Sequence, residues 1–236
     1  NAQGFPQWET NGILISDNPQ DSWLTDWDMT ADAANHAILA FPDIRNGGTN
    51  IAVYRIAPDG SFTWGADGIV ISSSTFNAAP KVTVTAAGNA VFAWQADDVI
   101  IRQKISAEGD LLWGDNGIMM SGANTFSWPQ VLPVGDDDVV MKFFEDTPPV
   151  WAPTRHVFAQ RFDPNGDAVW AQPTVISDAG GISAWTQIFP FINDGNDGFF
   201  IAWHDDRDNN MLANIWVQHI GSDGSVLFAD DGVEVS

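Results

Sequence analysis

The sequence has no cysteine, a single tyrosine, and only nine lysine and arginine residues against 31 aspartate and glutamate residues. Without cysteine, the chain forms no disulfide, no thiolate nucleophile and no cysteine-based zinc site. No run of roughly 18 apolar residues is present, so we expect no membrane-spanning helix. The net charge of −22 repels nucleic-acid phosphates and anionic lipid heads. We therefore expect neither nucleic acid nor a membrane surface as a partner.

What the sequence does contain is a repeat rich in aromatic residues. A fourteen-residue segment occurs as DGSFTWGADGIVIS at 59–72, EGDLLWGDNGIMMS at 108–121 and DGSVLFADDGVEVS at 223–236. An aromatic residue follows a turn glycine by four positions at Trp8, Trp64, Trp113, Trp170 and Phe228. A recurrence of roughly 50 residues is typical of repeat folds. We expect these aromatic residues to pack between neighbouring repeats.

Each repeat contains four short β-rich runs separated by Gly, Asn and Asp turns. In the second repeat the runs are Lys81–Thr85, Ala90–Trp94, Val99–Ile105 and a run that begins at Leu111. No window has a sustained period of 3.6 residues, so helix content should be near zero. Four antiparallel strands in a repeat of this length predict an all-β fold, a β-propeller of four-stranded antiparallel blades.

The repeats divide one domain, residues 1–236, into units 19–72, 73–121, 122–178 and 179–236, preceded by a partial unit, 1–18, that holds only a fourth strand. Two arrangements fit this count: a ring of four blades with a surplus strand, or a stretch of a longer repeat array. A strand without a sheet exposes an edge that another chain can pair with. Residues 5–16 are therefore the predicted interface for self-association or a partner chain.

The repeat has a motif that is most complete in the last unit. It comprises Trp203, Asp205 and Arg207, then Ile215, Gln218 and Ile220, and then the turn Asp223-Gly224. This pattern resembles repeat proteins that Bacteroidetes and related environmental bacteria secrete or display on their surface. The resemblance implies a β-propeller in a secreted or cell-surface location, and it implies little about activity.

Three tryptophans are the candidate ligand-binding residues. Trp27, Trp128 and Trp185 stand where the first strand of three of the four units begins. The first strand of a blade lies closest to the axis, so these indoles should lie at one rim of the central channel, where they could stack on sugar rings. The alternative is ordinary packing beneath the loops that precede these strands.

An acidic loop, NDGNDG at 193–198, is the candidate metal site. Calcium prefers hard oxygen ligands, and the leading ligands would be Asp194, Asn196 and Asp197. No stretch matches the EF-hand loop pattern, and hairpin turns favour Asn, Asp and Gly for their backbone conformations alone. A structural turn without calcium is therefore the alternative.

No catalytic residue is predicted. The four histidines are scattered without metal-binding spacing, and nucleophile-elbow, phosphate-loop and dinucleotide-binding motifs are absent. Three functions are therefore expected, in this order. The first is a non-enzymatic extracellular module for binding or display, with a glycan as the favoured ligand. The second is a structural subunit of a surface assembly, and the third is a calcium-dependent enzyme that acts on glycosides.

Overall fold

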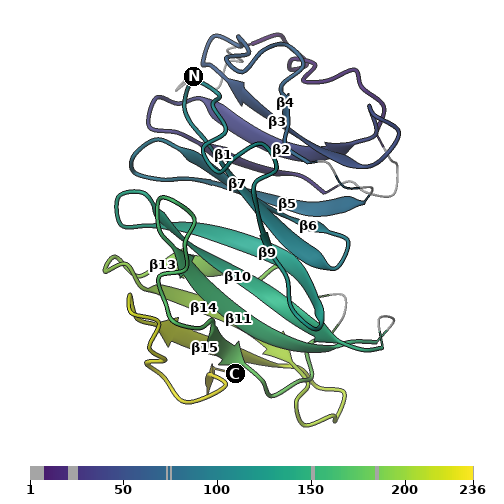
Figure 1. Cartoon of the computed structure of the whole chain (residues 1–236). Coiled ribbons are helices and arrows are strands. Elements are labelled where there is room, and N and C mark those ends of the chain that lie inside the picture. Colours follow the sequence, from purple (N-terminus) through teal and green to yellow (C-terminus); the bar gives the residue numbers. More distant parts are fainter. Residues whose placement is uncertain are drawn as a thin grey trace.

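The computed structural model describes residues 8–20, 26–72, 74, 76–149, 152–183 and 186–235. These residues form sixteen strands arranged in four antiparallel four-stranded sheets, and none of them is helical. In Figure 1 the sheets are stacked in chain order, from the purple N-terminal sheet to the yellow C-terminal sheet. The expectation of an all-β chain of four-stranded antiparallel sheets is confirmed.

The strand order within every sheet follows the chain, because short turns join consecutive antiparallel strands. Sheet 1 contains β1 (Asp28–Ala31), β2 (Ala37–Asp43), β3 (Asn50–Ile56) and β4 (Ile69–Val70). Sheet 2 contains β5 (Asn77–Val84), β6 (Ala90–Ala96), β7 (Val99–Ile105) and β8 (Ile118–Met120). Sheet 3 contains β9 (Thr125–Val134), β10 (Asp138–Thr147), β11 (Thr154–Phe162) and β12 (Thr174–Ser177). Sheet 4 contains β13 (Phe191–Asn193), β14 (Phe199–Asp205), β15 (Asn214–Ile220) and β16 (Val233–Glu234).

The first strand of each sheet is its inner strand. Contacts between inner strands run from β1 to β5, from β5 to β9 and from β9 to β13. A small cavity of about 200 Å³ lies among these strands and is lined in part by Asp28, Lys81, Gln130 and Phe191. Within the described residues, sheet 4 makes no extensive strand contact with sheet 1. The four sheets thus form a curved stack around this cavity that, within the described residues, stays open between sheet 4 and sheet 1, which differs from a closed ring of four.

The hydrophobic core is divided into layers between successive sheets. Ile51 and Trp64 of sheet 1 pack with Phe92 of sheet 2 in the first layer. The second layer contains Ala93 and Trp113 with Met141 and Phe143, and the third contains Phe144 and Trp170 with Phe199 and Trp203. Most strands therefore bury both faces, which explains their nearly continuous apolar runs.

The repeated tryptophan joins each sheet to the next by a hydrogen bond as well as by packing. Its indole N–H donates to a backbone carbonyl in the turn between the third and fourth strands of the following sheet. The pairs are Trp64 with Ala107 (3.2 Å), Trp113 with Pro164 (3.0 Å) and Trp170 with Ser222 (3.1 Å). The prediction that these aromatic residues pack between repeats is confirmed.

The same carbonyl also accepts a hydrogen bond from a cation on the third strand of the preceding sheet. The pairs are Arg55 with Ala107 (3.2 Å), Lys104 with Pro164 (3.2 Å) and Arg161 with Ser222 (3.3 Å). Each interface between sheets therefore has one acceptor that receives an indole and a cationic donor. Hydrogen bonds from charged donors are stronger than neutral ones, so this contact fixes how neighbouring sheets are aligned.

Two constraints, a positive φ and the close approach of an indole, require glycine two residues after this carbonyl. Gly109 and Gly224 have φ values of +100° and +85°. A Cβ there would stand 3.1 Å from the ring of Trp64 and 2.7 Å from the ring of Trp170. Only glycine combines this conformation with so close an approach of the indole.

We predict that Trp113→Ala destabilises the fold by about 3–5 kcal/mol, because it leaves a cavity between two sheets and removes a buried hydrogen bond. Phe228→Ala is the matched control. Phe228 holds the same repeat position in sheet 4 but is 39% exposed, against 7% for Trp113, so its loss should be about 1 kcal/mol or less. Urea unfolding measures both, and equal losses would contradict the role assigned to the indole.

Candidate functional site

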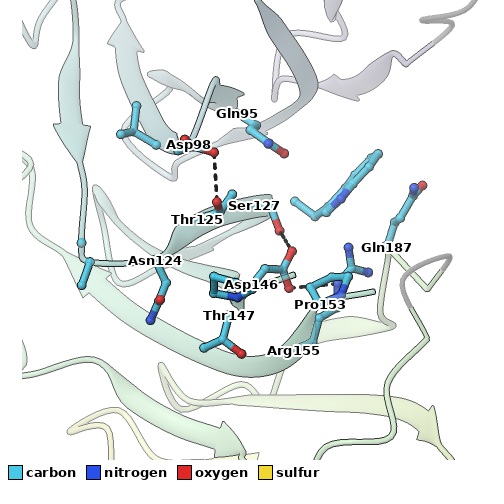
Figure 2. Close-up of a pocket in the computed structure, with 15 residues that line it drawn as sticks. Gln95, Asp98, Asn124, Thr125, Ser127, Asp146, Thr147, Pro153, Arg155 and Gln187 are labelled. Atoms are coloured by element: carbon cyan, nitrogen blue, oxygen red, sulfur yellow. Dashed lines mark hydrogen bonds and ion pairs between the residues drawn. The ribbon is translucent and has the colours of Figure 1, made fainter. Parts of the chain in front are cut away.

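The main candidate site is a cavity of about 520 Å³ at the edge of the stack where the inner strands begin (Figure 2). It lies between sheets 2 and 3 and is bounded on one side by the segment that leads to β13. Its polar and aromatic lining comprises Gln95, Asp98, Asn124, Thr125, Ser127, Trp128, Asp146, Thr147, Arg155 and Gln187. The cavity therefore gathers side chains from three of the four repeats.

A β-bulge in β9 positions Trp128. The pairing of β9 with β10 shifts register here, and Trp128 has φ +49° directly before Pro129. A left-handed conformation at a bulky residue costs about 1–3 kcal/mol and persists only where the surroundings enforce it. The same bulge occurs in β5, where Ala79 has φ +51° before Pro80. The first strand is therefore bent in both sheets, and in sheet 3 the bend places an indole at the cavity.

Lys142 on β10 holds the bulge in place by hydrogen bonding. Its ammonium donates to the carbonyls of Trp128 (3.2 Å) and Gln187 (3.3 Å) and lies 3.5 Å from the centre of the Phe144 ring. Its side chain is fully buried, and burial lowers the pKa of Lys142 well below 10.5, with the nearby Arg155 acting in the same direction. One buried cation thus holds together two segments that line the cavity.

Asp146 is the carboxylate at the base of the cavity. Its Oδ1 accepts from Nε of Arg155 at 3.0 Å, and its Oδ2 accepts from the Ser127 hydroxyl at 2.7 Å. Arg155 is 4% exposed and also donates to the carbonyl of Thr186 at 2.6 Å. The guanidinium therefore compensates the charge of Asp146 and ties it to the segment that precedes β13.

Asp146 is not part of the structural repeat. The ion pairs of sheets 1 and 4 join Asp43 to Arg45 and Asp205 to Arg207. Asp43 and Asp205 each lie opposite an asparagine near the start of the third strand, Asn50 and Asn214. In sheet 3 the equivalent position of the register is Glu145, which lies opposite His156. Glu145 is thus their counterpart, and Asp146 and Arg155 form an additional pair that the longer β10–β11 hairpin brings to the cavity.

A second carboxylate reaches the cavity from sheet 2. Asp98, in the turn between β6 and β7, accepts from the hydroxyl of Thr125 at 2.9 Å. Figure 2 shows Asp98 bonded to Thr125 and Asp146 bonded to Ser127, so one strand, β9, joins the two carboxylates. Carboxylates from different sheets, an indole and a guanidinium therefore share one solvent-accessible cavity.

The structure does not bring the predicted rim tryptophans together. Trp128 lines the cavity between sheets 2 and 3, whereas Trp27 is 65% exposed and lines a separate cavity of about 390 Å³ with Leu14 and Phe41. Trp185 lies outside the described residues. Among the described residues, the two predicted rim tryptophans therefore line different cavities, Trp128 one and Trp27 another.

The predicted calcium ligands have other partners. Asp194 accepts from the amides of Asn196 (2.7 Å) and Gly198 (3.0 Å) and pairs with His219 (2.7 Å). The hydrogen bond from His219, followed by that from the Asn196 amide, lowers the pKa of Asp194. Asp197 accepts from the amide of Gly135 at 2.8 Å. The described residues include no group of three or more His, Cys, Asp or Glu side chains able to hold a metal ion.

An ion pair that recurs in three sheets explains why the pKa of Asp194 is lowered. Each of three sheets pairs an aspartate near the connection of its first and second strands with a basic residue on its third strand. The pairs are Asp32 with Arg55, Asp138 with Arg161 and Asp194 with His219. Asp194 therefore caps a turn and pairs with a neighbouring strand, which accounts for the acidic loop without calcium.

Sequence reasoning missed four residues of the cavity: Asp98, Asp146, Arg155 and Gln187. One signal for two of them was present. The segment FFEDTPPVWAPTRH stands in the third unit where units one and four have the Asp43–Arg45 and Asp205–Arg207 pairs, and it contains both Asp146 and Arg155. Asp98 sits in an ordinary hairpin turn, where an acidic residue carries no information beyond its turn preference.

No protein-family model and no curated protein matches the sequence. Solved structures do share its fold. A thermostable family-43 glycoside hydrolase matches with a TM-score of 0.55 and 10% identity, over 93% of this chain and 74% of that chain. An endo-arabinase from Bacteroides thetaiotaomicron matches with a TM-score of 0.53 and 14% identity, over 88% and 82%. An α-L-arabinofuranosidase from Fusarium graminearum matches with a TM-score of 0.53 and 6% identity, over 93% and 70%.

These comparisons correct the first functional expectation. The chain was expected to be a non-enzymatic module for binding or display, because no catalytic motif was found. The three solved structures described above, which share its fold, are named as a glycoside hydrolase, an endo-arabinase and an α-L-arabinofuranosidase. Active sites on such folds are assembled from residues distant in the sequence, so the absence of a local motif was a poor guide.

The described residues contain no helix long and apolar enough to cross a lipid bilayer.

We predict that Lys142→Met flattens the dependence of stability on pH. Because the pKa of Lys142 is lower in the folded than in the unfolded chain, the unfolded chain binds more protons between the folded value and 10.5. Stability should therefore rise with pH across this interval. Lys142→Met should lose that rise, because methionine carries no titrating group. Urea unfolding of both proteins between about pH 7 and 10 tests this, and an unchanged slope would contradict it.

Proposed function

We propose that the chain acts on glycosides and that the cavity between sheets 2 and 3 is its substrate site. The observation that carries this proposal is the meeting of Asp98 and Asp146, from different sheets, beside Trp128 and Arg155. A volume of about 520 Å³ is that of a small-molecule site. The fold shared with glycoside hydrolases supports the same class of activity.

The lining suits a sugar. An indole offers an apolar face to the C–H face of a pyranose or furanose ring and keeps an N–H for a polar partner. Asn124 and Gln187 provide amide donors and acceptors for hydroxyl groups. Trp128 would therefore bind the ring, and the two amides would set its orientation.

The two carboxylates have different surroundings, as glycoside hydrolysis requires. In that reaction one carboxyl group protonates the leaving oxygen, while the other stays ionised and acts on the anomeric carbon or on the attacking water. Asp146, paired with Arg155 and bonded to Ser127, is suited to the ionised role. Asp98 lies at the mouth of the cavity on the neighbouring sheet, and we assign it the acid role.

The names of the structural neighbours guide the choice of substrate. They include an endo-arabinase and an endo-1,4-β-xylanase from Bacteroides thetaiotaomicron, the latter with a TM-score of 0.51 and 9% identity. Arabinan and xylan, both pentose polymers, are therefore the first substrates to test.

We predict that Asp146→Asn and Asp98→Asn each lower hydrolysis of the best substrate by about 10²–10⁴-fold, the usual contribution of one acid or base. Release of reducing sugar measures the rate. Asp115→Asn, an exposed aspartate on another edge of sheet 2, is the control and should keep full activity. Thermal unfolding of each variant separates lost chemistry from lost fold. A folded Asp146→Asn protein with normal activity would contradict the assignment, and so would a wild-type protein that hydrolyses neither polymer nor their oligosaccharides.

We further predict that Trp128→Ala raises KM about tenfold, which corresponds to about 1.4 kcal/mol, and changes kcat much less. The indole contributes to binding without touching the bond that breaks. Trp27→Ala is the matched control, because Trp27 lines a different cavity. An equal effect of both substitutions would place the sugar elsewhere.

A further inference from the structure

Among the described residues, one face of sheet 4 has no neighbouring sheet. Phe199, Ile201 and Trp203 point toward sheet 3 and are 0–3% exposed. Alternate residues of a strand point to opposite faces, so Phe200 and Ala202 belong to the other face. They are only partly buried, and Ile192, which lies opposite Phe200 in the register, is 61% exposed.

The corresponding face of every other sheet is covered. The strand register makes Ile38, Val91 and Val140 the counterparts of Phe200, since each lies opposite the basic residue of the third strand. All three are at most 1% exposed. The outer face of sheet 4 thus has the composition of an interface between sheets but lacks its partner among the described residues.

Phe228 shows the same difference at the repeat aromatic. Trp64, Trp113 and Trp170 are each 7% exposed because the turn of the next sheet covers them. Phe228 is 39% exposed and packs only on its own sheet, with its ring centre 6.4 Å from that of Phe200. A turn glycine could pack on the Phe228 ring as it does on the tryptophans. Because phenylalanine has no indole N–H, this contact requires no carbonyl acceptor.

The other end of the curved stack carries a complementary feature, and it converges with sheet 4 at the inner strands, since Asp28 of β1 and Phe191 of β13 line the same small cavity. Residues 8–12 form the same turn as the fourth-strand segments, since the amide of Gly12 donates to the carbonyl of Glu9 just as the amide of Gly68 donates to Gly65. Trp8 donates to the carbonyl of Pro58 at 2.9 Å, which is the contact made at the other interfaces. Residues 8–16 therefore lie on sheet 1 as the last strand of a preceding sheet would.

This segment lacks the sheet to which such a strand belongs. Ile13 and Ile15 pack against the cluster of Phe41 and Tyr54. The equivalent residues of sheets 1 and 2 form β4 and β8 and pair with third strands, whereas residues 8–16 belong to none of the sixteen strands. Beside them lies the cavity of about 390 Å³ lined by Leu14, Ile15, Leu39 and Phe41. A strand edge and an apolar space are therefore available together.

We propose that these two surfaces form one docking site for a three-stranded antiparallel β-sheet of the same repeat type. Its third strand pairs with residues 13–15, which become the fourth strand of the completed sheet. One of its faces covers Phe200, Ala202 and Ile192, and its turn glycine packs on Phe228. The occupant is thus defined by chemistry: an apolar face, an open edge on its third strand and a glycine turn.

A second copy of this chain fits less well. Its sheet 1 cannot stack on sheet 4 as successive sheets do, because Trp8 and Ile13 already cover the face that would be used. Contact between two sheet 4 faces would bury Phe228 but leave residues 13–15 unpaired. Only a three-stranded sheet satisfies both surfaces.

The test extends the full chain at Ser236 with a short flexible linker and a second copy of its own residues 76–110, which supply three strands and the turn glycine Gly109. A second extension uses residues 26–61, which include the turn glycine Gly60. Hydrogen exchange reports on the amides of residues 13–15. Because the chain has no cysteine, Phe228→Cys provides a single alkylation site that reports on sheet 4. Phe92→Asp within the appended copy only is the matched control, since Phe92 faces the preceding sheet.

We expect at least one extension to slow exchange at residues 13–15 about 100-fold and alkylation at position 228 about tenfold, and the Phe92→Asp copy to do neither. The unextended chain should exchange and alkylate rapidly. Protection of residues 13–15 in the unextended chain would overturn the proposal, as would unchanged rates in both extensions. A dimer of the unextended chain that Phe200→Asp dissociates would also overturn it, because the occupant would then be a second copy.

Discussion

One backbone carbonyl at each interface between sheets governs how the whole chain is assembled. It accepts the indole N–H of the repeat tryptophan and a hydrogen bond from an arginine or lysine of the same preceding sheet, for example from Trp113 and Lys104 at Pro164. The glycine that follows lets the indole approach the backbone. Two donors that converge on one acceptor fix both the distance and the rotation between sheets, which apolar packing alone leaves adjustable. The spacing of the core layers follows from this contact.

This contact lies at the edge where the turns between third and fourth strands meet, which leaves the opposite edge free to vary. There the hairpin between β10 and β11 is longer than its counterparts and introduces Asp146 and Arg155. The bulge at Trp128 and the buried Lys142 shape the wall of the same cavity. A rigid repeated edge and a variable edge with strained or buried polar groups is the usual division between scaffold and site.

The ends of the stack follow the same rule as its interior. Each interface between sheets combines an apolar sheet face, a repeat aromatic residue and a glycine turn. The outer face of sheet 4 provides an apolar face and Phe228, and sheet 1 carries the segment with Trp8. Residues 8–16, which the repeat count left without a sheet, therefore match the repeat as its fourth-strand segment, and the hydrogen bond from Trp8 to Pro58 holds them on sheet 1. The carboxylates of the cavity lie at a different edge of the molecule, so the proposed substrate site and the proposed docking site are separate surfaces.

The sequence by itself determined the sheets, because local signals define them. Turn glycines such as Gly109 and apolar runs such as Ala90–Ala96 set strand number, order and hairpins, and the spacing of Trp64, Trp113 and Trp170 identified the residues that join the sheets. The cavity depended on tertiary structure. Asp98 and Asp146 are distant in sequence and meet only because sheets 2 and 3 stack, and the acidic loop at Asp194 became a capped turn because His219 lies beside it. In a chain with 31 acidic residues, only proximity in space distinguishes a carboxylate in a site from one at the surface.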